Sequence, residues 1–246
     1  IGRRYAGMLR ENGIETALDL CHQPQGWVRQ RMGMVGLRTV LELKGRPCIG
    51  LETQPPDKKT TTVSRSFPAP LTRLEDLREA VASFAARAAE KLRQGNLITA
   101  GVTVFIHTSR FRTHDAQHHD AVTVALPCPT NHTTAITRAA LAGVERMFRP
   151  GCRYKKAGVL LLDLVRTEGA QPDLFWSGGS EKDPDRCLMN VVDSLNRKLG
   201  RGAVFYGSAG IRPGWHQDGR QDWRMRQAHR SPRFTTNWNE LPQVRG

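Results

Sequence analysis

Hydrophobic positions in residues 58–166 follow strand spacing and helix spacing in a regular order. Four segments predict strands, because they are rich in β-branched residues or alternate apolar with polar: Lys58 to Phe67, Gly101 to Thr108, Ala121 to Leu126 and Tyr154 to Val165. Two segments carry apolar residues at helical spacing: Leu74, Leu77, Val81, Phe84, Ala88 and Leu92, then Ile136, Ala140, Val144 and Met147. This βαββαβ order predicts an α+β, ferredoxin-like domain with a four-stranded antiparallel sheet and two helices on one face.

Local signals mark where these two helices begin and end. Thr72 with Glu75 predicts a capping box at the start of the first helix, and Gly95 predicts its end. Pro150-Gly151 stops the second helix.

Residues 1–57 predict a small helical domain. Helices are expected from Arg3 to Glu11, in a turn capped by Thr16, and from Gly26 to Leu43, and a linker at 54–57 ends the domain. Gly2 and Gly13 resemble the second half of a helix-hairpin-helix, in which backbone N–H groups at a helix N-terminus bind a phosphate. Gly2 and Arg3 are therefore candidate DNA-binding residues, although an ordinary helical pair explains the pattern equally well.

Residues 167–246 predict an acidic linker at 167–185 and an irregular, basic C-terminal tail at 186–246. Within the tail a short helix is expected from Leu188 to Leu199 and a short strand from Ala203 to Tyr206. Beyond these, interleaved Trp and Arg suit either stacking on nucleic acid or ordering against a protein partner.

The charge of the chain indicates a polyanionic partner. The net charge is +14, and residues 58–166 alone carry 17 basic and 8 acidic side chains. Nucleic acid fits this charge better than a membrane, since no apolar run could span a bilayer. Five scattered cysteines without a C-x-x-C pair, and no visible secretory signal, favour a reducing cytoplasm. The initial Ile predicts that the chain is a fragment.

The uncovered face of the predicted sheet is the candidate nucleic-acid surface. Small hydroxyl side chains allow a phosphate backbone to approach, and cations neutralise it. The candidates are Ser64, Arg65 and Ser66 on the first strand and Arg153, Lys155 and Lys156 at the start of the last strand. The alternative is a merely solvated polar face.

A short peptide in the acidic linker has the form of a sliding-clamp binding motif. Gln171 offers an amide, and Leu174 and Phe175 offer adjacent apolar anchors for a pocket. The alternative is that the pair packs against its own domain.

Catalytic and metal-binding chemistry is not predicted. Asp163 is a lone acid in an apolar strand, whereas two-metal polymerase sites need closely placed carboxylates. His114, Asp115, His118, His119 and Asp120 cluster in an expected loop, but their spacing matches no strong ligand pattern.

The chain resembles the C-terminal half of Y-family translesion DNA polymerases of the UmuC type. The resemblance rests on Gly2-Arg3-Arg4, on Ser64 to Phe67, on 85–93, on Tyr154 to Val159, on Gln171 to Phe175 and on the tail from Leu195 to Thr236. It implies a thumb remnant at 1–57 and a little finger at 58–166 that lies along duplex or primer-template DNA. It further implies binding of the sliding clamp, and UmuD-type accessory subunits and RecA as partners of the tail. Mg²⁺ is expected only for the palm, which this sequence lacks.

The function expected from the sequence is the DNA-binding and clamp-recruiting part of an error-prone lesion-bypass (SOS mutagenesis) polymerase. The alternative is a stand-alone, non-catalytic DNA-binding adaptor that competes for the clamp. RNA-recognition domains share the βαββαβ order, but residues 101–107 lack their stacked-aromatic signature. A small-molecule regulatory domain is disfavoured by the charge.

Overall fold

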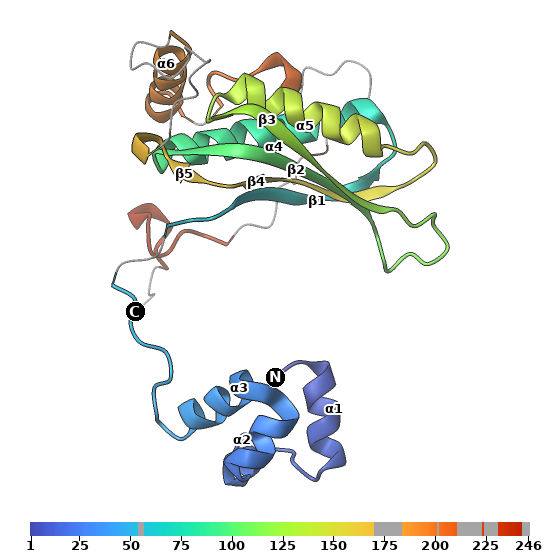
Figure 1. The fold of residues 1–246 in the computed structure, drawn as a ribbon, viewed down its shortest axis with the longest axis vertical. Helices are drawn as coiled ribbons and strands as arrows, with labels where there is room; N and C mark the ends of the chain where they lie inside the picture. The colour runs from blue at the N-terminus through green and yellow to red at the C-terminus, as the bar shows by residue number, and fades with distance from the viewer. Residues whose placement is uncertain (54–56, 170–183, 201, 211–222, 224–230, 243–246) are drawn as a thin grey trace. The chain divides into compact units, whose positions relative to one another are not determined.

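The computed structural model describes the chain except residues 54–56, 170–183, 201, 211–222, 224–230 and 243–246 (Figure 1). The chain divides into two compact units, Ile1–Asp57 and Lys58–Gly246. In the described part, no helix is both long and apolar enough to cross a membrane.

The first unit consists of the three predicted helices, α1 (Arg3–Glu11), α2 (Ala17–His22) and α3 (Gln25–Leu43). A capping box starts α2: the Asp19 N–H donates to Thr16 Oγ1 over 3.1 Å, and the Thr16 N–H donates to Asp19 Oδ2 over 2.9 Å. One small apolar core joins the helices, formed by Leu9, Ile14, Leu20, Val28, Met32 and Val40.

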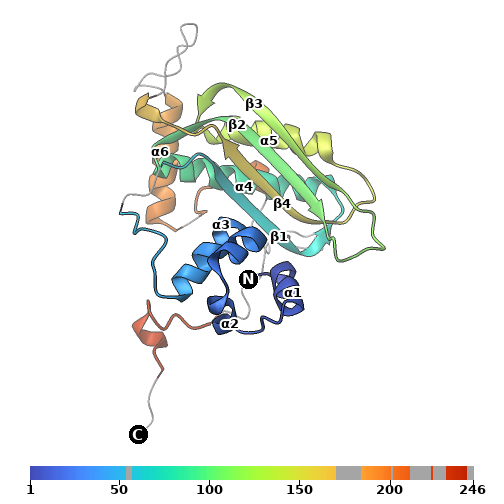
Figure 2. The same cartoon turned by 60° about the horizontal axis from the view of Figure 1, so that its bottom comes forward.

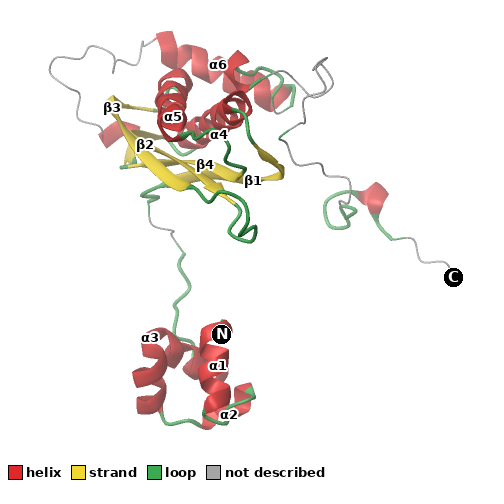
Figure 3. Cartoon of the chain, turned by 90° about the vertical axis from the view of Figure 1, so that its right-hand side faces the viewer, coloured by secondary structure: helices red, strands yellow, loops and turns green. Residues whose placement is uncertain are grey.

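The second unit is built on an antiparallel sheet (Figure 2). Its strands are β1 (Thr61–Leu71), β2 (Leu97–Thr108), β3 (His119–Thr130) and β4 (Tyr154–Leu162), in the spatial order β1-β4-β2-β3. A short β5 (Val165–Arg166) extends the pairing of β2. Two helices, α4 (Leu74–Gln94) and α5 (Thr133–Met147), cover one face (Figure 3). The predicted α+β class, the βαββαβ order and the single helical layer are confirmed.

Some local predictions for this unit were wrong. α4 begins after Arg73, and no side chain caps it, so the Thr72 capping box does not form. β3 begins at His119 rather than Ala121, and β4 ends at Leu162 because Asp163 adopts a positive φ of 50°. Ala203 to Tyr206 forms a bend and irregular backbone that lead into a 3₁₀ helix, η2 (Gly207–Ala209), instead of a strand.

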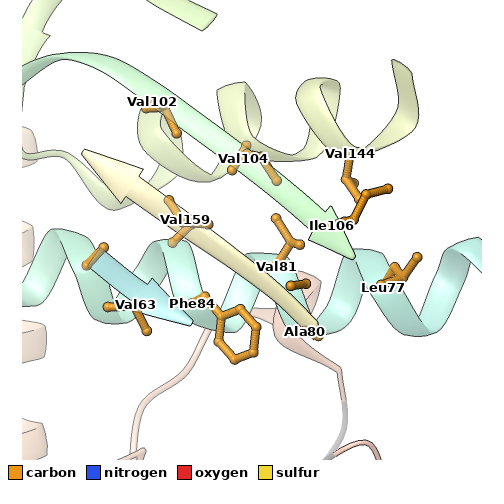
Figure 4. Close-up of a cluster of buried hydrophobic side chains, with 14 of the residues drawn as sticks. Val63, Leu77, Ala80, Val81, Phe84, Val102, Val104, Ile106, Val144 and Val159 are labelled. Carbon is orange, nitrogen blue, oxygen red and sulfur yellow. The ribbon is translucent and has the colours of Figure 1, made fainter. Parts of the chain in front are cut away.

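The core lies between the sheet and the two helices (Figure 4). Val102, Val104 and Ile106 of β2 are fully buried there and meet side chains of α4 and α5. Gly143 lets α5 approach closely, since a Cβ at this position would lie 3.3 Å from Val104 Cγ2. Because successive strand side chains point to opposite faces, this core also fixes which residues of each strand face away from the helices.

The tail packs on the helical side of the sheet. The predicted tail helix is present as α6 (Pro184–Lys198). Asp193 of α6 forms a bidentate ion pair with Arg93 of α4, at 2.6 Å to Nε and 2.8 Å to Nη2. Trp223 meets Phe84 of α4 edge to face, with ring centroids 5.7 Å apart. Asp193 of α6, η2 and Trp223 therefore pack against α4 of their own domain.

Candidate nucleic-acid interface

The sheet face turned away from α4 and α5 is the candidate interface, and we call it the open face. Its residues alternate with the buried core positions of the same strands. It consists of Thr62, Ser64 and Ser66 on β1, Lys156, Gly158 and Leu160 on β4, Thr103, Phe105 and His107 on β2, and His119, Ala121 and Thr123 on β3.

The strand register arranges these residues in rows that cross the sheet. One row runs from Ser66 through Lys156 and His107 to His119, and the next runs from Ser64 through Gly158 and Phe105. Hydrogen bonds join β2 to β3 within the rows: Thr103 Oγ1 lies 2.8 Å from Thr123 Oγ1, and His107 Nδ1 lies 3.1 Å from His119 Nδ1. The open face is thus an ordered surface of hydroxyls, rings and one ammonium group.

The electrostatics of the open face favour an anion. Lys156 is exposed, and none of the open-face residues is acidic. Burial lowers the pKa of His107, and electrostatic interactions with His119 and Lys156 lower it further. Lys156 supplies the ammonium group of the open face, and hydroxyl groups on the same face can donate hydrogen bonds.

The three candidate DNA-binding residues on β1 lie on different faces of the sheet. Ser64 and Ser66 lie on the open face. Arg65 has the opposite strand parity: it lines one cavity with Val63 and Phe84 on the helical side, and its Nη1 donates to Ser64 O over 2.9 Å. The sequence predicted Arg65 among the small hydroxyl residues of the uncovered face. That placement was wrong, because Arg65 points to the helical side.

The three cations near the start of β4 also differ in their surroundings. Arg153 is half-exposed and pairs with Asp115 over 3.4 Å. Lys155 donates to the backbone carbonyls of Phe67 and Pro68, which ties β1 to β4 where their register shifts. Only Lys156 of the three is on the open face, where its Nζ lies 5.8 Å from the centre of the Phe105 ring.

Gly2 and Arg3 belong to the first unit. Gly2 is the N-cap of α1 with an extended backbone, no side chain caps the helix, and both residues are exposed. The first turn of α1 contains no acidic residue. This N-terminus has the polarity that favours an anion.

The histidines and aspartates between 114 and 120 do not all lie in the one loop that the sequence had predicted. His118 is buried, and its Nδ1 lies 3.0 Å from the Tyr154 hydroxyl, whereas His119 begins β3 and lies on the open face. Asp115 pairs with Arg153 and Arg112. Within the described ranges, no three His, Cys, Asp or Glu side chains come together as a metal site would require.

The clamp-motif residues Gln171, Leu174 and Phe175 lie outside the described residues. Several open-face residues were missed by sequence reasoning: Thr103, Phe105, His107, His119 and Thr123. The alternation of β2 contained the signal for three of them, because they alternate with the buried Val102, Val104 and Ile106.

Comparison with known proteins identifies the sheet domain. Residues 58–174 match the model of the impB/mucB/samB family C-terminal domain. The chain is 37% identical to Protein UmuC of Salmonella typhimurium over 245 residues, covering 100% of this chain and 56% of that protein. The second unit thus contains an impB/mucB/samB family C-terminal domain. The chain is also 38% identical to Protein MucB of Escherichia coli over 242 residues, covering 98% of this chain and 55% of that protein.

Two further matches refine this assignment. Residues 186–244 match a domain of unknown function, DUF4113. DNA polymerase IV of Brucella melitensis is 23% identical over 210 residues, covering 84% of this chain and 44% of that protein. The chain spans about half the length of the relatives it matches, and it corresponds to the C-terminal part of UmuC-type proteins.

Proposed function

We propose that this chain is the DNA-binding and clamp-recruiting part of an error-prone lesion-bypass DNA polymerase. In this proposal the little finger holds duplex DNA by its phosphate backbone through the open face. The observation that carries the proposal is a sheet face turned away from α4 and α5, whose described residues include Lys156 and several hydroxyls and no acidic side chain. The comparisons support it, because relatives of the chain include a protein named DNA polymerase IV.

The physical basis of this grip is charge neutralisation. Lys156 displaces a counterion from the phosphate it pairs with, and Ser66 offers a hydroxyl donor beside it in the same row. The Thr103 and Thr123 hydroxyls lie further along the open face. Contacts to phosphates carry no base information, so little sequence preference is expected. This property suits a polymerase that must hold DNA at any position.

Clamp recruitment is assigned to Gln171, Leu174 and Phe175 on their sequence pattern. The described residues before and after this peptide are both attached to the sheet domain. The Thr167 N–H donates to Asn96 O over 2.9 Å, and the Arg93–Asp193 ion pair holds α6 on the other side. A clamp bound to this peptide would therefore be kept beside the same domain that holds DNA.

The remaining assignments are proposals that rest on the likeness to UmuC-type proteins. UmuD-type subunits and RecA are proposed partners of the tail, where α6 exposes Leu188, Val191 and Leu195. The proposed location is the cytoplasm, on DNA. Mg²⁺ is assigned to a palm that would be supplied in addition to the residues of this sequence.

The salt dependence of duplex binding tests whether residues of the open face contact DNA phosphates. We expect Lys156→Ala to reduce the slope of log affinity against log salt by about one unit, because one phosphate contact is lost. Arg65→Ala removes the same charge from the helical side and should change the slope by less than half as much. Equal slopes for both variants would show that net charge, rather than the open face, governs binding.

A further inference from the structure

Three aromatic rings form a continuous platform on the open face. Phe105 and His107 are two residues apart on β2, with ring centroids 5.3 Å apart and an interplanar angle of 56°. His119 of β3 continues the row, with its centroid 5.3 Å from that of His107 and an angle of 46°. The rings lie on the exposed side of the sheet because all three residues share the open-face parity.

A glycine on β4 makes room for the Phe105 ring. Gly158 of β4 lies opposite Phe105, and a Cβ at Gly158 would stand 2.3 Å from Phe105 Cζ and 2.5 Å from Ser64 Cβ. The ring thus extends over the glycine into space that any other residue would fill. A glycine in a central strand often marks such a close approach.

Among the described residues of the open face, Lys156 is the cation nearest the platform, and none is acidic. Lys156 Nζ is 5.8 Å from the Phe105 ring centre and stands in the same row as His107. The groups that face His107 are Lys156 from β4 and His119 from β3, and both lower its pKa in addition to burial. At neutral pH His107 is therefore an uncharged ring, which can stack without binding an anion itself.

We propose that Phe105, His107 and His119 stack the base of an unpaired nucleotide while Lys156 pairs with its phosphate. Every base has a π-face, so such stacking tolerates any sequence. The bases of a duplex are already stacked inside the helix, so the platform distinguishes unpaired from paired strands. The inference rests on the proposed DNA-binding function and adds a site for single-stranded DNA to it.

The full chain with a short oligothymidylate strand and a duplex of equal length provides the test. Phe105→Leu keeps an apolar side chain and removes the ring, so we expect about tenfold weaker binding of the single strand, with duplex affinity within about twofold. Phe105→Tyr retains the ring and should retain single-strand binding. Phe111→Leu is the matched control, since Phe111 is 83% exposed in the loop after β2.

A fluorescent base gives a direct readout of stacking. A single strand with 2-aminopurine should lose fluorescence on binding the parent chain and Phe105→Tyr, and should lose much less on binding Phe105→Leu. The thermal midpoint of each variant checks that the domain remains folded. If single-strand affinity and quenching survive in Phe105→Leu while duplex binding is normal, the platform proposal is wrong. If the parent chain binds neither DNA, the proposed function itself is wrong.

Discussion

The ring of Phe105 occupies the space in which a side chain at Gly158 would stand. The two residues are paired across β2 and β4, and a Cβ at position 158 would come within 2.3 Å of the ring. The glycine is therefore a steric requirement of the open face. This relationship links the packing of the sheet to the surface that the chain offers to DNA.

Gly158→Ala should destabilise the second unit by about 1–3 kcal/mol, because Phe105 and Ser64 must both give way to the new methyl group. Urea unfolding followed by circular dichroism measures the loss. Gly101→Ala is the matched control: Gly101 is a strand glycine on the neighbouring β2, and its Cβ would meet nothing closer than 3.8 Å. Equal losses for the two variants would contradict the steric account.

The Arg93–Asp193 ion pair is predicted to hold the tail on the little finger. The Arg93 side chain is 9% exposed, and its Nη1 also donates to Asn131 O over 2.8 Å and to Thr133 Oγ1 over 2.9 Å. Arg93→Ala leaves Asp193 without its partner, and breaking such a buried pair costs roughly 3–5 kcal/mol. Hydrogen exchange should show α6 losing protection first.

Arg87→Ala is the control for the ion pair, because Arg87 is on the same helix and forms a partly exposed pair with Glu90 three residues later. Such a pair within one helix contributes about 0.2–0.5 kcal/mol, so α6 should stay protected. Unchanged exchange of α6 in Arg93→Ala would show that other contacts hold the tail.

The stability of the second unit is predicted to fall at acidic pH. Burial lowers the pKa of both His107 and His118 below the ordinary value of 6.5. The unfolded chain therefore binds protons more readily, so the free energy of unfolding is highest above pH 6.5 and decreases as the pH falls below it. His107→Gln should flatten this decrease, as measured by urea midpoints at pH 7.5 and 5.5.

The clamp assignment predicts a separation of functions. The double substitution Leu174→Ala with Phe175→Ala should abolish binding to a bacterial sliding clamp, because the apolar anchors carry most of the energy of such peptides. Duplex affinity and the thermal midpoint should stay the same. Asp173→Ala, between the motif's polar and apolar residues, should retain clamp binding in surface plasmon resonance. If the double variant instead unfolds the little finger, the pair is part of its core.

Sequence periodicity predicted the helices and strands well because their apolar residues repeat at regular spacing. Val81 and Phe84 mark the buried side of α4, and both are in the core as expected. The strand order β1-β4-β2-β3 could not be predicted, since spacing within a strand says nothing about its neighbours.

The errors have local physical causes. A threonine with an acid three residues later suggested a capping box, but the chain enters α4 one residue later, at Arg73. Arg65 was assigned to the open face by its neighbours, although the buried Val63 and Phe67 share its parity. The partners of Lys155 are backbone carbonyls of a distant strand, which no sequence pattern could indicate.

One negative charge placed on each side of the sheet in turn tests whether DNA lies on the open face. Thr123 is exposed on the open face, and Thr134 is exposed on α5 of the helical side. Thr123→Glu and Thr134→Glu are identical changes in net charge, so their duplex affinities by fluorescence anisotropy differ only through position. The account predicts about tenfold weaker binding for Thr123→Glu, since a charge beside a phosphate repels it, and less than twofold for Thr134→Glu. Equal losses, or a larger loss for Thr134→Glu, would contradict it.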